Sequence, residues 1–158
     1  MEAIDKTCEE IINQLSQFTG TEHYHKMTFN PYLLFTDGMQ FLFDSYGAYW
    51  LGDLINCSFP KIMRDFNENG DTFYIIDVKV TDGLLNGSFT ISREVDEERK
   101  IIVEQNVGYI NLPAGDYQFF MTVELRKDGV LSGVVMLPSE YKKILDSYKR
   151  LIMTKLNR

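Results

Sequence analysis

The sequence predicts an α+β domain with N-terminal helices, an antiparallel β-meander of about five strands, and a C-terminal amphipathic helix packed on the sheet. The length of 158 residues is typical of one domain with one sizeable core. Apolar residues recur at three- and four-residue spacing near both ends, whereas the middle is rich in β-branched and aromatic residues that partly alternate with polar ones. Because no linker, repeat or low-complexity stretch interrupts the chain, we place one domain over residues 1–158.

Four helical segments are expected before the strands begin. They cover residues 2–17, 39–45, 48–57 and 60–66. Acidic residues crowd toward the start of the first segment, where the helix dipole favours them. Thr36 or Asp37 is expected to cap the second segment, Gly47 breaks it, and Pro60 begins the last one.

Five strands are expected in the middle of the chain. They cover residues 72–81, 88–95, 100–107, 117–125 and 130–137. The turn dipeptides Asp82-Gly83 and Asn86-Gly87 separate the first two, and a charged turn over residues 96–99 separates the next two. Hairpin connections of this kind are too short for parallel crossovers, so antiparallel pairing is expected.

A terminal helix is expected after the strands. Pro138 ends the sheet, and Ser139 is expected to cap a helix that runs to about residue 157. Its apolar stripe is expected to cover one face of the sheet. The stripe consists of Tyr141, Ile144, Leu145, Tyr148, Leu151, Ile152 and Leu156.

Charge divides the chain into an acidic body and a basic tail. The whole chain carries a formal −7, and from Pro138 onward six basic residues oppose two acidic ones. The tail is therefore +4 and the remainder −11. An acidic body repels nucleic acid, so we expect direct nucleic-acid binding at most through the tail, where Lys142, Lys149 and Arg150 could attract an anionic partner. A solvated helix face is the alternative interpretation of these cations.

Other features are typical of a cytoplasmic protein. No run of about 18 apolar residues is present, so neither a transmembrane helix nor a membrane partner is expected. The acidic N-terminus lacks the basic and apolar regions of a signal peptide. Cys8 and Cys57 are the only cysteines and lie in helical patterns, which favours reduced, half-buried thiols.

The segment Glu22-His23-Tyr24-His25 is the most enzyme-like feature. In an extended chain His23 and His25 point the same way, as two metal ligands do. The chain has only two histidines, however, and a helical metal-binding spacing is absent. We therefore expect an aromatic surface loop and no metal.

The three carboxylates Asp37, Asp44 and Asp53 are close enough in sequence to form a paired-carboxylate site. Turn and cap chemistry beside Gly38 explains Asp37 equally well, and the other two suit polar positions of short helices. No nucleophile elbow, phosphate-binding loop or RNA-binding signature is present. We therefore expect no catalytic residues and no cofactor.

Several short motifs resemble those of an uncharacterised family of small proteins from bacteria, phages and mobile elements. They are Phe18-Thr19-Gly20-Thr21-Glu22-His23-Tyr24, Leu33-Leu34-Phe35-Thr36-Asp37-Gly38, Gly47-Ala48-Tyr49-Trp50-Leu51, Asp53-Leu54-Ile55 and Leu137-Pro138-Ser139-Glu140-Tyr141. The resemblance spans Phe18 to Tyr141. This chain departs from the family in having Phe35 where tyrosine is usual and in its long basic extension after Tyr141.

The resemblance implies a small interaction protein of phage or mobile-element type. Its sharpest form is an anti-CRISPR-like inhibitor that binds a basic, RNA-guided host nuclease. The residues expected to contact the partner are Glu22, His23, Tyr24, His25, Asp37, Tyr49, Trp50, Lys142, Lys149 and Arg150. One alternative is a small enzyme or ligand-binding domain with a site around Glu22, His23, Asp37 and Asp53. The other is a regulatory homodimer that associates through the terminal helix.

Overall fold

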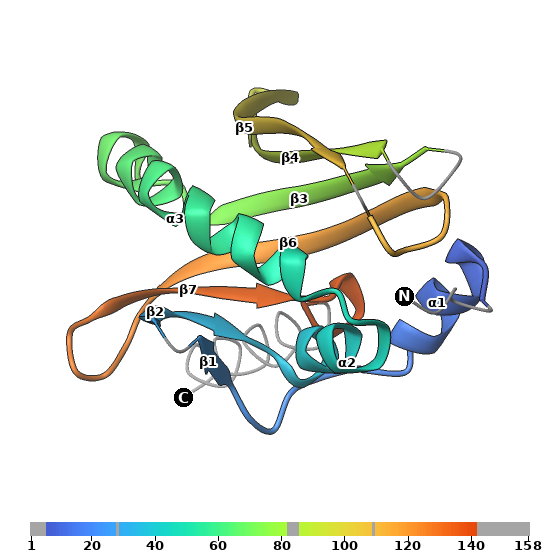
Figure 1. Cartoon of the computed structure of the whole chain (residues 1–158). Coiled ribbons are helices and arrows are strands. Elements are labelled where there is room, and N and C mark those ends of the chain that lie inside the picture. The colour runs from blue at the N-terminus through green and yellow to red at the C-terminus, as the bar shows by residue number, and fades with distance from the viewer. Residues whose placement is uncertain (1–5, 28, 82–85, 109, 142–158) are drawn as a thin grey trace, which may run out of the picture.

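The structure, a computed structural model, describes residues 6–27, 29–81, 86–108 and 110–141. Within these residues, seven strands form one mixed sheet in the order β1-β2-β7-β6-β3-β4-β5 (Figure 1). Their bounds are His25–Met27 (β1), Asn30–Phe35 (β2), Phe73–Val80 (β3), Asn86–Val95 (β4), Glu98–Gly108 (β5), Gly115–Leu125 (β6) and Leu131–Met136 (β7). All neighbours are antiparallel except β2 and β7, which are parallel.

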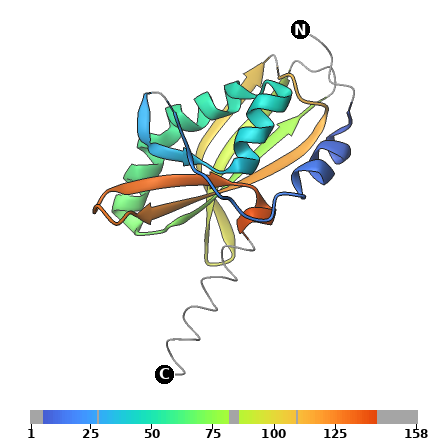
Figure 2. The same ribbon diagram turned by 90° about the horizontal axis from the view of Figure 1, so that it is seen from below.

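Three helices accompany the sheet within the described residues: α1 (Cys8–Leu15), α2 (Asp37–Tyr46) and α3 (Tyr49–Asn69). Figures 1 and 2 show α2 and α3 on the same face of the sheet. Helix α3 contacts β2 and β5, α2 contacts β2 and β7, and α1 packs against β6. The overall class is therefore α+β, as the sequence predicts.

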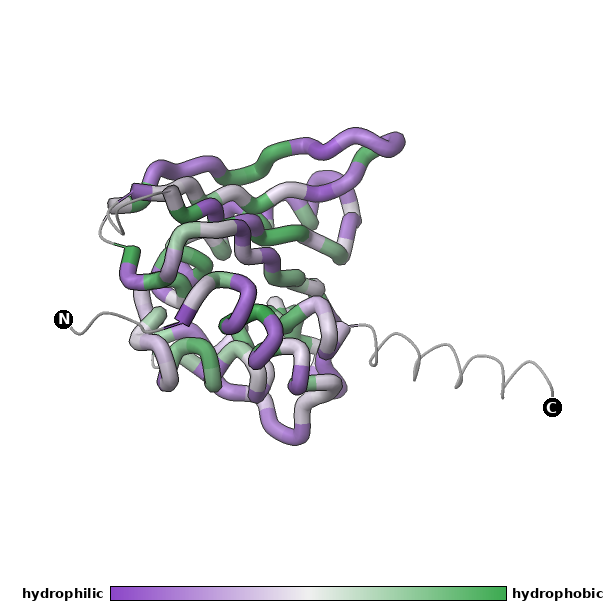
Figure 3. Tube along the Cα trace, turned by 90° about the vertical axis from the view of Figure 1, so that its right-hand side faces the viewer, coloured by the Kyte–Doolittle hydropathy of each residue, from purple (hydrophilic) through white to green (hydrophobic). Residues whose placement is uncertain are grey.

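The main core lies between the sheet and its helices. Alternate strand residues face the helices and are buried, and Figure 3 shows the corresponding changes of hydropathy along the chain trace. The largest fully buried side chains are Tyr74, Tyr117, Phe89 and Phe119, from three adjacent strands. On the edge of this core Arg93 of β4 lies 2.7 Å from Asp65 of α3, which ties the far half of the helix to the sheet.

The opposite face of the sheet has a smaller apolar cluster at its β2–β7–β6 side. Leu34, Val134 and Met136 are its buried members. Phe73, Phe120 and Tyr141 stack beside them with ring centroids 5.0 to 5.4 Å apart. On the β3–β4–β5 side the same face becomes polar, because the paired residues there are Asp77, Thr90 and Glu104.

The predicted antiparallel meander is wrong in topology. Strand β6 pairs with β3, not with β5, so the chain crosses over after β5 and places its last two strands on the other side of β3. The prediction also lacks β1 and β2, because Asn30 and Pro31 look like a break in the sequence. Pro31 fits since β2 is short and pairs with β7 only from Leu33 onward.

The two helical segments predicted around Pro60 form one helix. Helix α3 runs through Pro60 because its buried face continues on both sides of the proline, at Ile55 and Ile62. Proline removes only one N–H donor from the helix, and packing against the sheet outweighs that loss. Ala48 is the residue before the helix and not its first turn.

The turns also differ from the prediction. Asn86 and Gly87 belong to β4, where a Cβ at Gly87 would lie 2.4 Å from the Lys79 carbonyl oxygen, so glycine permits a close backbone approach. The β4–β5 turn consists of Asp96 and Glu97 alone, both with positive φ (50° and 70°), and β5 begins directly at Glu98.

Within the described residues the first helix is shorter than predicted, and the terminal helix begins one residue earlier than predicted. Thr7 caps α1, which begins at Cys8 and ends at Leu15, while residues 1–5 lie outside the described residues. After β7 a helical turn begins at Pro138, one residue before the predicted cap Ser139, and the Tyr141 N–H donates to the Leu137 carbonyl. The predicted apolar stripe from Ile144 to Leu156 lies outside the described residues.

Candidate functional site

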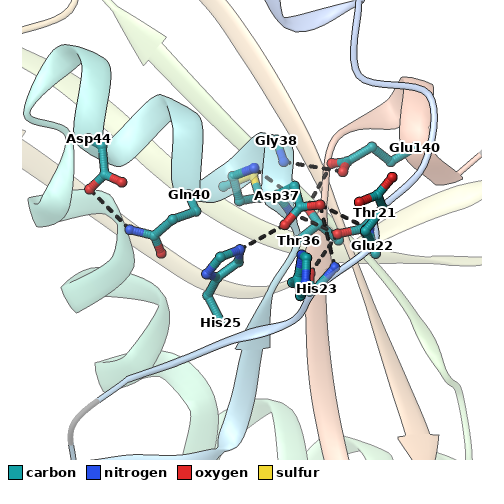
Figure 4. A network of polar contacts seen from close by, with 11 residues as sticks. Thr21, Glu22, His23, His25, Thr36, Asp37, Gly38, Gln40, Asp44 and Glu140 are labelled. Carbon is teal, nitrogen blue, oxygen red and sulfur yellow. Dashed lines mark hydrogen bonds and ion pairs between the residues drawn. The ribbon is translucent and has the colours of Figure 1, made fainter.

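Asp37 connects the loop before β1 to the start of α2 through hydrogen bonds. One Asp37 carboxylate oxygen accepts the backbone N–H groups of Glu22 (2.9 Å) and His23 (3.4 Å), and the other lies 2.8 Å from His25 Nε2 (Figure 4). The Asp37 backbone N–H donates in return to the Thr21 hydroxyl. These hydrogen bonds, led by that from Glu22, lower the pKa of Asp37 to about 2, so it is ionised at neutral pH.

A second carboxylate, Glu140, holds the other side of the same helix start. Its side chain is fully buried and accepts three donors: the Thr36 hydroxyl at 2.6 Å, the Leu137 N–H at 3.0 Å and the Gly38 N–H at 3.3 Å. Burial raises the pKa of Glu140, although these three hydrogen bonds act in the opposite direction. Glu140 thereby joins the end of β7 to the first turn of α2.

Gly38 is required by this arrangement. A Cβ at position 38 would lie 2.4 Å from Leu137 Cδ1 and 2.7 Å from Glu140 Oε1. We call Thr21, Thr36, Asp37, Gly38 and Glu140 the latch. It is built from three of the sequence motifs, which contribute Thr21, the Thr36-Asp37-Gly38 step and Glu140.

The far end of α2 carries a separate polar group. Asp44 accepts the Gln40 side-chain amide at 3.1 Å and the hydroxyl of Tyr49, the first residue of α3. The hydrogen bond from Tyr49 is the main cause of the lowered pKa of Asp44. Asp37 and Asp44 are seven residues apart on one helix, about 10 Å along its axis, so they do not form a carboxylate pair.

A cleft of about 250 Å³ opens beside this second group, between β1, α2 and α3. Its floor contains the buried rings of Phe35 and Phe43. Its lining is completed by Lys26, Met27, Gln40, Tyr49, Gly52 and Asp53. We refer to it as the α2–α3 cleft.

The structure brings together only part of the predicted contact set. Glu22, His23, His25 and Asp37 meet at the latch, and Tyr49 meets Asp53 at the cleft. Lys142, Lys149 and Arg150 lie outside the described residues.

Two of the predicted contact residues lie elsewhere. Burial, followed by the charges of Glu124 and Glu140, raises the pKa of Tyr24, and Tyr24 is not among the described residues that line the cleft. Trp50 donates from Nε1 to Asn111 at 2.7 Å, and the Asn111 amide binds the carbonyls of Tyr46 and Gly47. Trp50 therefore fixes the α2–α3 corner and is not part of the cleft.

The sequence prediction did not select Thr21, Gln40 or Glu140 as site residues, and it named Thr36 only as a possible helix cap. Glu140 follows Pro138 in a motif that reads as a helix start, where an exposed acid is ordinary. A signal was present in the motifs themselves, since each of the three contributes a threonine or an acid. Only the fold shows that they meet.

The hydrogen bonds of the latch hold backbone groups in place. Every oxygen of Asp37 is engaged in holding the backbone or His25, and no serine or cysteine hydrogen-bonds to that histidine among the described residues. In the same part of the chain no group of three or more His, Cys, Asp or Glu residues could hold a metal ion. Nor is any helix in it long and apolar enough to cross a membrane.

Comparison with known proteins gives a family and no activity. A family model described as "Family of unknown function (DUF6876)" matches residues 9–141. Searches of curated proteins and of solved structures found no match to the chain.

Proposed function

The chain belongs to the family of unknown function DUF6876, and we propose that it is a non-enzymatic interaction protein that docks on a basic, nucleic-acid-handling host protein. The observation that carries the proposal is the surplus of exposed carboxylates. Residues 1–137 carry a formal −11. Such a surface is attracted to proteins that bind nucleic acid and are therefore basic at their binding channels.

The tip of the β4–β5 hairpin supports the proposal. Glu94, Asp96, Glu97 and Glu98 are all exposed there, and none makes an ion pair with another described residue. Asp96 and Glu97 both adopt the left-handed conformation, which asparagine and glycine fill at lower conformational cost in a two-residue turn. Acidic residues at this costly position are consistent with selection for surface charge.

The hydrogen bonds of the latch also support a non-enzymatic role. The carboxylates of the latch hold backbone N–H groups, so both have a structural task. The sharpest form of the proposal is an anti-CRISPR-like inhibitor of phage or mobile-element origin, acting in the cytoplasm on an RNA-guided nuclease. The acidic body then occupies the channel that the nucleic acid would enter.

Capture from a bacterial lysate tests the proposal. Immobilised chain is compared with a variant in which Glu94, Asp96, Glu97 and Glu98 are changed to their amides. We expect the wild-type chain to retain a nucleic-acid-handling protein, the variant to retain much less of it, and the soluble chain to displace nucleic acid from it. Retention of the same protein by both forms, without displacement of nucleic acid, would contradict the proposal.

A further inference from the structure

The α2–α3 cleft has the composition of a binding pocket and the size of a single side chain. Its volume of about 250 Å³ is below the range of roughly 300 to 1,000 Å³ that drug-sized ligands occupy. Gly52 keeps it open, because a side chain there would project toward Phe43, whose ring is the nearest group at 3.4 Å. The polar atoms of Gln40, Tyr49 and Asp53 surround the aromatic floor.

The charge of the cleft favours a cation. Asp53 lines the cleft, and Asp44 stands beside it through its hydrogen bonds to Gln40 and Tyr49. Neither carboxylate makes an ion pair with another residue in the described part of the chain. Two carboxylates that make no ion pair within the described residues, at the mouth of an apolar cleft, attract a positively charged group.

Among the described residues, Lys26 is the one basic residue that lines the cleft, and it makes no ion pair with Asp44 or Asp53. It pairs with Leu34 of β2, whose side chain belongs to the cluster on the opposite face of the sheet. Side chains directly opposite each other point to the same face, so the Lys26 side chain starts on that opposite face.

The aromatic groups complete the site. The rings of Phe43 and Tyr49 lie 6.3 Å apart at 35°, and Phe35 meets Phe43 edge to face at 5.0 Å. Tyr49 is about half exposed, so its ring face is accessible at the mouth. Aromatic faces beside carboxylates are the usual surroundings of an arginine or lysine side chain, which offers both an apolar stem and a charged end.

We propose that the α2–α3 cleft is an anchor pocket for an arginine or lysine side chain of the protein partner. The inference rests on the proposed function, because the docking partner is the protein that supplies the basic side chain. The stem lies on Phe35 and Phe43, and the charged end lies between Asp44 and Asp53, next to the Tyr49 ring. A buried basic residue in such a pocket is the type of contact that dominates protein interfaces.

Backbone and side-chain amide NMR of the isolated chain tests the pocket without any partner. Blocked arginine and lysine amides are the probes, and blocked norleucine amide is the uncharged control. We expect saturable shifts at the Gly52 amide and the Gln40 side-chain amide with both cations, and none with norleucine. Asp53→Asn is expected to weaken binding at least about fivefold, as the loss of one close ionic contact implies.

Glu68→Gln is the matched control, because Glu68 is an exposed acid on the same helix about 22 Å further along it. It is expected to leave the shifts unchanged. Equal binding by the Asp53 and Glu68 variants, shifts spread over the whole acidic surface, or equal binding of norleucine would each overturn the pocket.

A second measurement identifies the source of the cation. In the complex with the captured partner, Asp53→Asn is expected to lower affinity at least about tenfold and Glu68→Gln less than twofold. If Asp53→Asn weakens arginine binding but leaves the partner's affinity unchanged, the assignment to a partner side chain is wrong. If the NMR titration shows no binding, the anchor pocket is contradicted and the docking proposal stands. If the titration is positive but the capture experiment fails, only the docking proposal is contradicted.

Discussion

The hydroxyl of Thr36 donates a 2.6 Å hydrogen bond to the carboxylate of Glu140, across 104 positions of sequence. Thr36 also caps α2 through the Met39 N–H. The bond therefore connects the start of a helix with the helical turn that follows the last strand.

Removal of the Glu140 side chain is expected to destabilise the fold strongly. Glu140→Ala leaves the Thr36 hydroxyl and two backbone N–H groups buried without acceptors. Each such group costs about 1 to 3 kcal/mol, so a loss of roughly 3 kcal/mol or more in the free energy of unfolding is expected in urea denaturation. A loss below about 1 kcal/mol would show that the latch is not structural.

The charge of Glu140 is expected to make stability depend on pH. Because burial raises its pKa in the folded state, the folded chain binds this proton more tightly than the unfolded chain does. The contribution is therefore complete below the ordinary carboxyl pKa and is lost as pH rises through the raised folded value. Relative to Glu140→Gln, the wild-type chain is expected to lose stability as pH rises from the ordinary carboxyl value of 4.5 toward neutrality. A stability difference that stays constant over this range would contradict the assignment.

Asp37 is expected to show the opposite pH dependence. Its pKa is lowered to about 2 by the Glu22 N–H, His25 and further hydrogen bonds, so its contribution is present above the ordinary value of 3.8 and is lost as pH falls toward 2. Asp37→Asn is expected to cost about 2 kcal/mol at neutral pH. The difference from wild type should shrink below about pH 4. Asp128→Asn in the exposed β6–β7 turn is the control, and an equal effect of both variants would contradict the prediction.

Two helical glycines are expected to respond oppositely to alanine. Gly38→Ala introduces a Cβ 2.4 Å from Leu137 Cδ1 and should cost about 1 to 3 kcal/mol of unfolding free energy by overpacking. Gly52→Ala meets its nearest neighbour, the Phe43 ring, at an ordinary 3.4 Å and should gain up to about 1 kcal/mol from helix propensity. Thermal or urea denaturation of both variants checks the pair, and a stable Gly38→Ala would show that the close approach of Glu140 is not required.

Substitutions in the β4–β5 turn are expected to raise the stability of the fold and to weaken partner binding. Changing Asp96→Asn and Glu97→Gly places favoured residues at the two left-handed positions, and roughly 1 kcal/mol of added stability is expected. The same change removes two carboxylates from the hairpin tip, so retention of the basic partner should decrease. A variant that is more stable and binds the partner equally well would remove the hairpin from the docking surface.

Local patterns predicted much of the fold. Thr36 and Gly47 bound α2 as expected, since side-chain capping and a left-handed glycine act within a few residues. The β3, β4 and β6 strands were found within two residues of their ends, because burial on one face imposes alternation. The strand order was not predictable in this way, because the pairing of β6 with β3 depends on packing between distant segments.

The sequence predicted that some of the site residues lie near one another, but it did not predict the hydrogen bonds that join them. Glu22, His23 and Asp37 were selected as polar residues near one another, and the structure does join them, but through backbone N–H groups instead of converging side chains. Glu140 was not selected because nothing in a local pattern distinguishes a buried acid at a helix start from an exposed one. Trp50 was selected as a contact residue, although its indole N–H donates to Asn111 at the α2–α3 corner.

The dependence of partner affinity on salt tests the central claim most directly. Binding of the captured protein to the full chain is measured from about 50 to 300 mM salt, where the Debye length falls from roughly 14 to 6 Å. Docking of the −11 body on a basic channel predicts an affinity that falls at least about tenfold over this range, with a smaller fall for the hairpin variant that lacks its four carboxylates. An affinity that is unchanged across the range would contradict electrostatic docking.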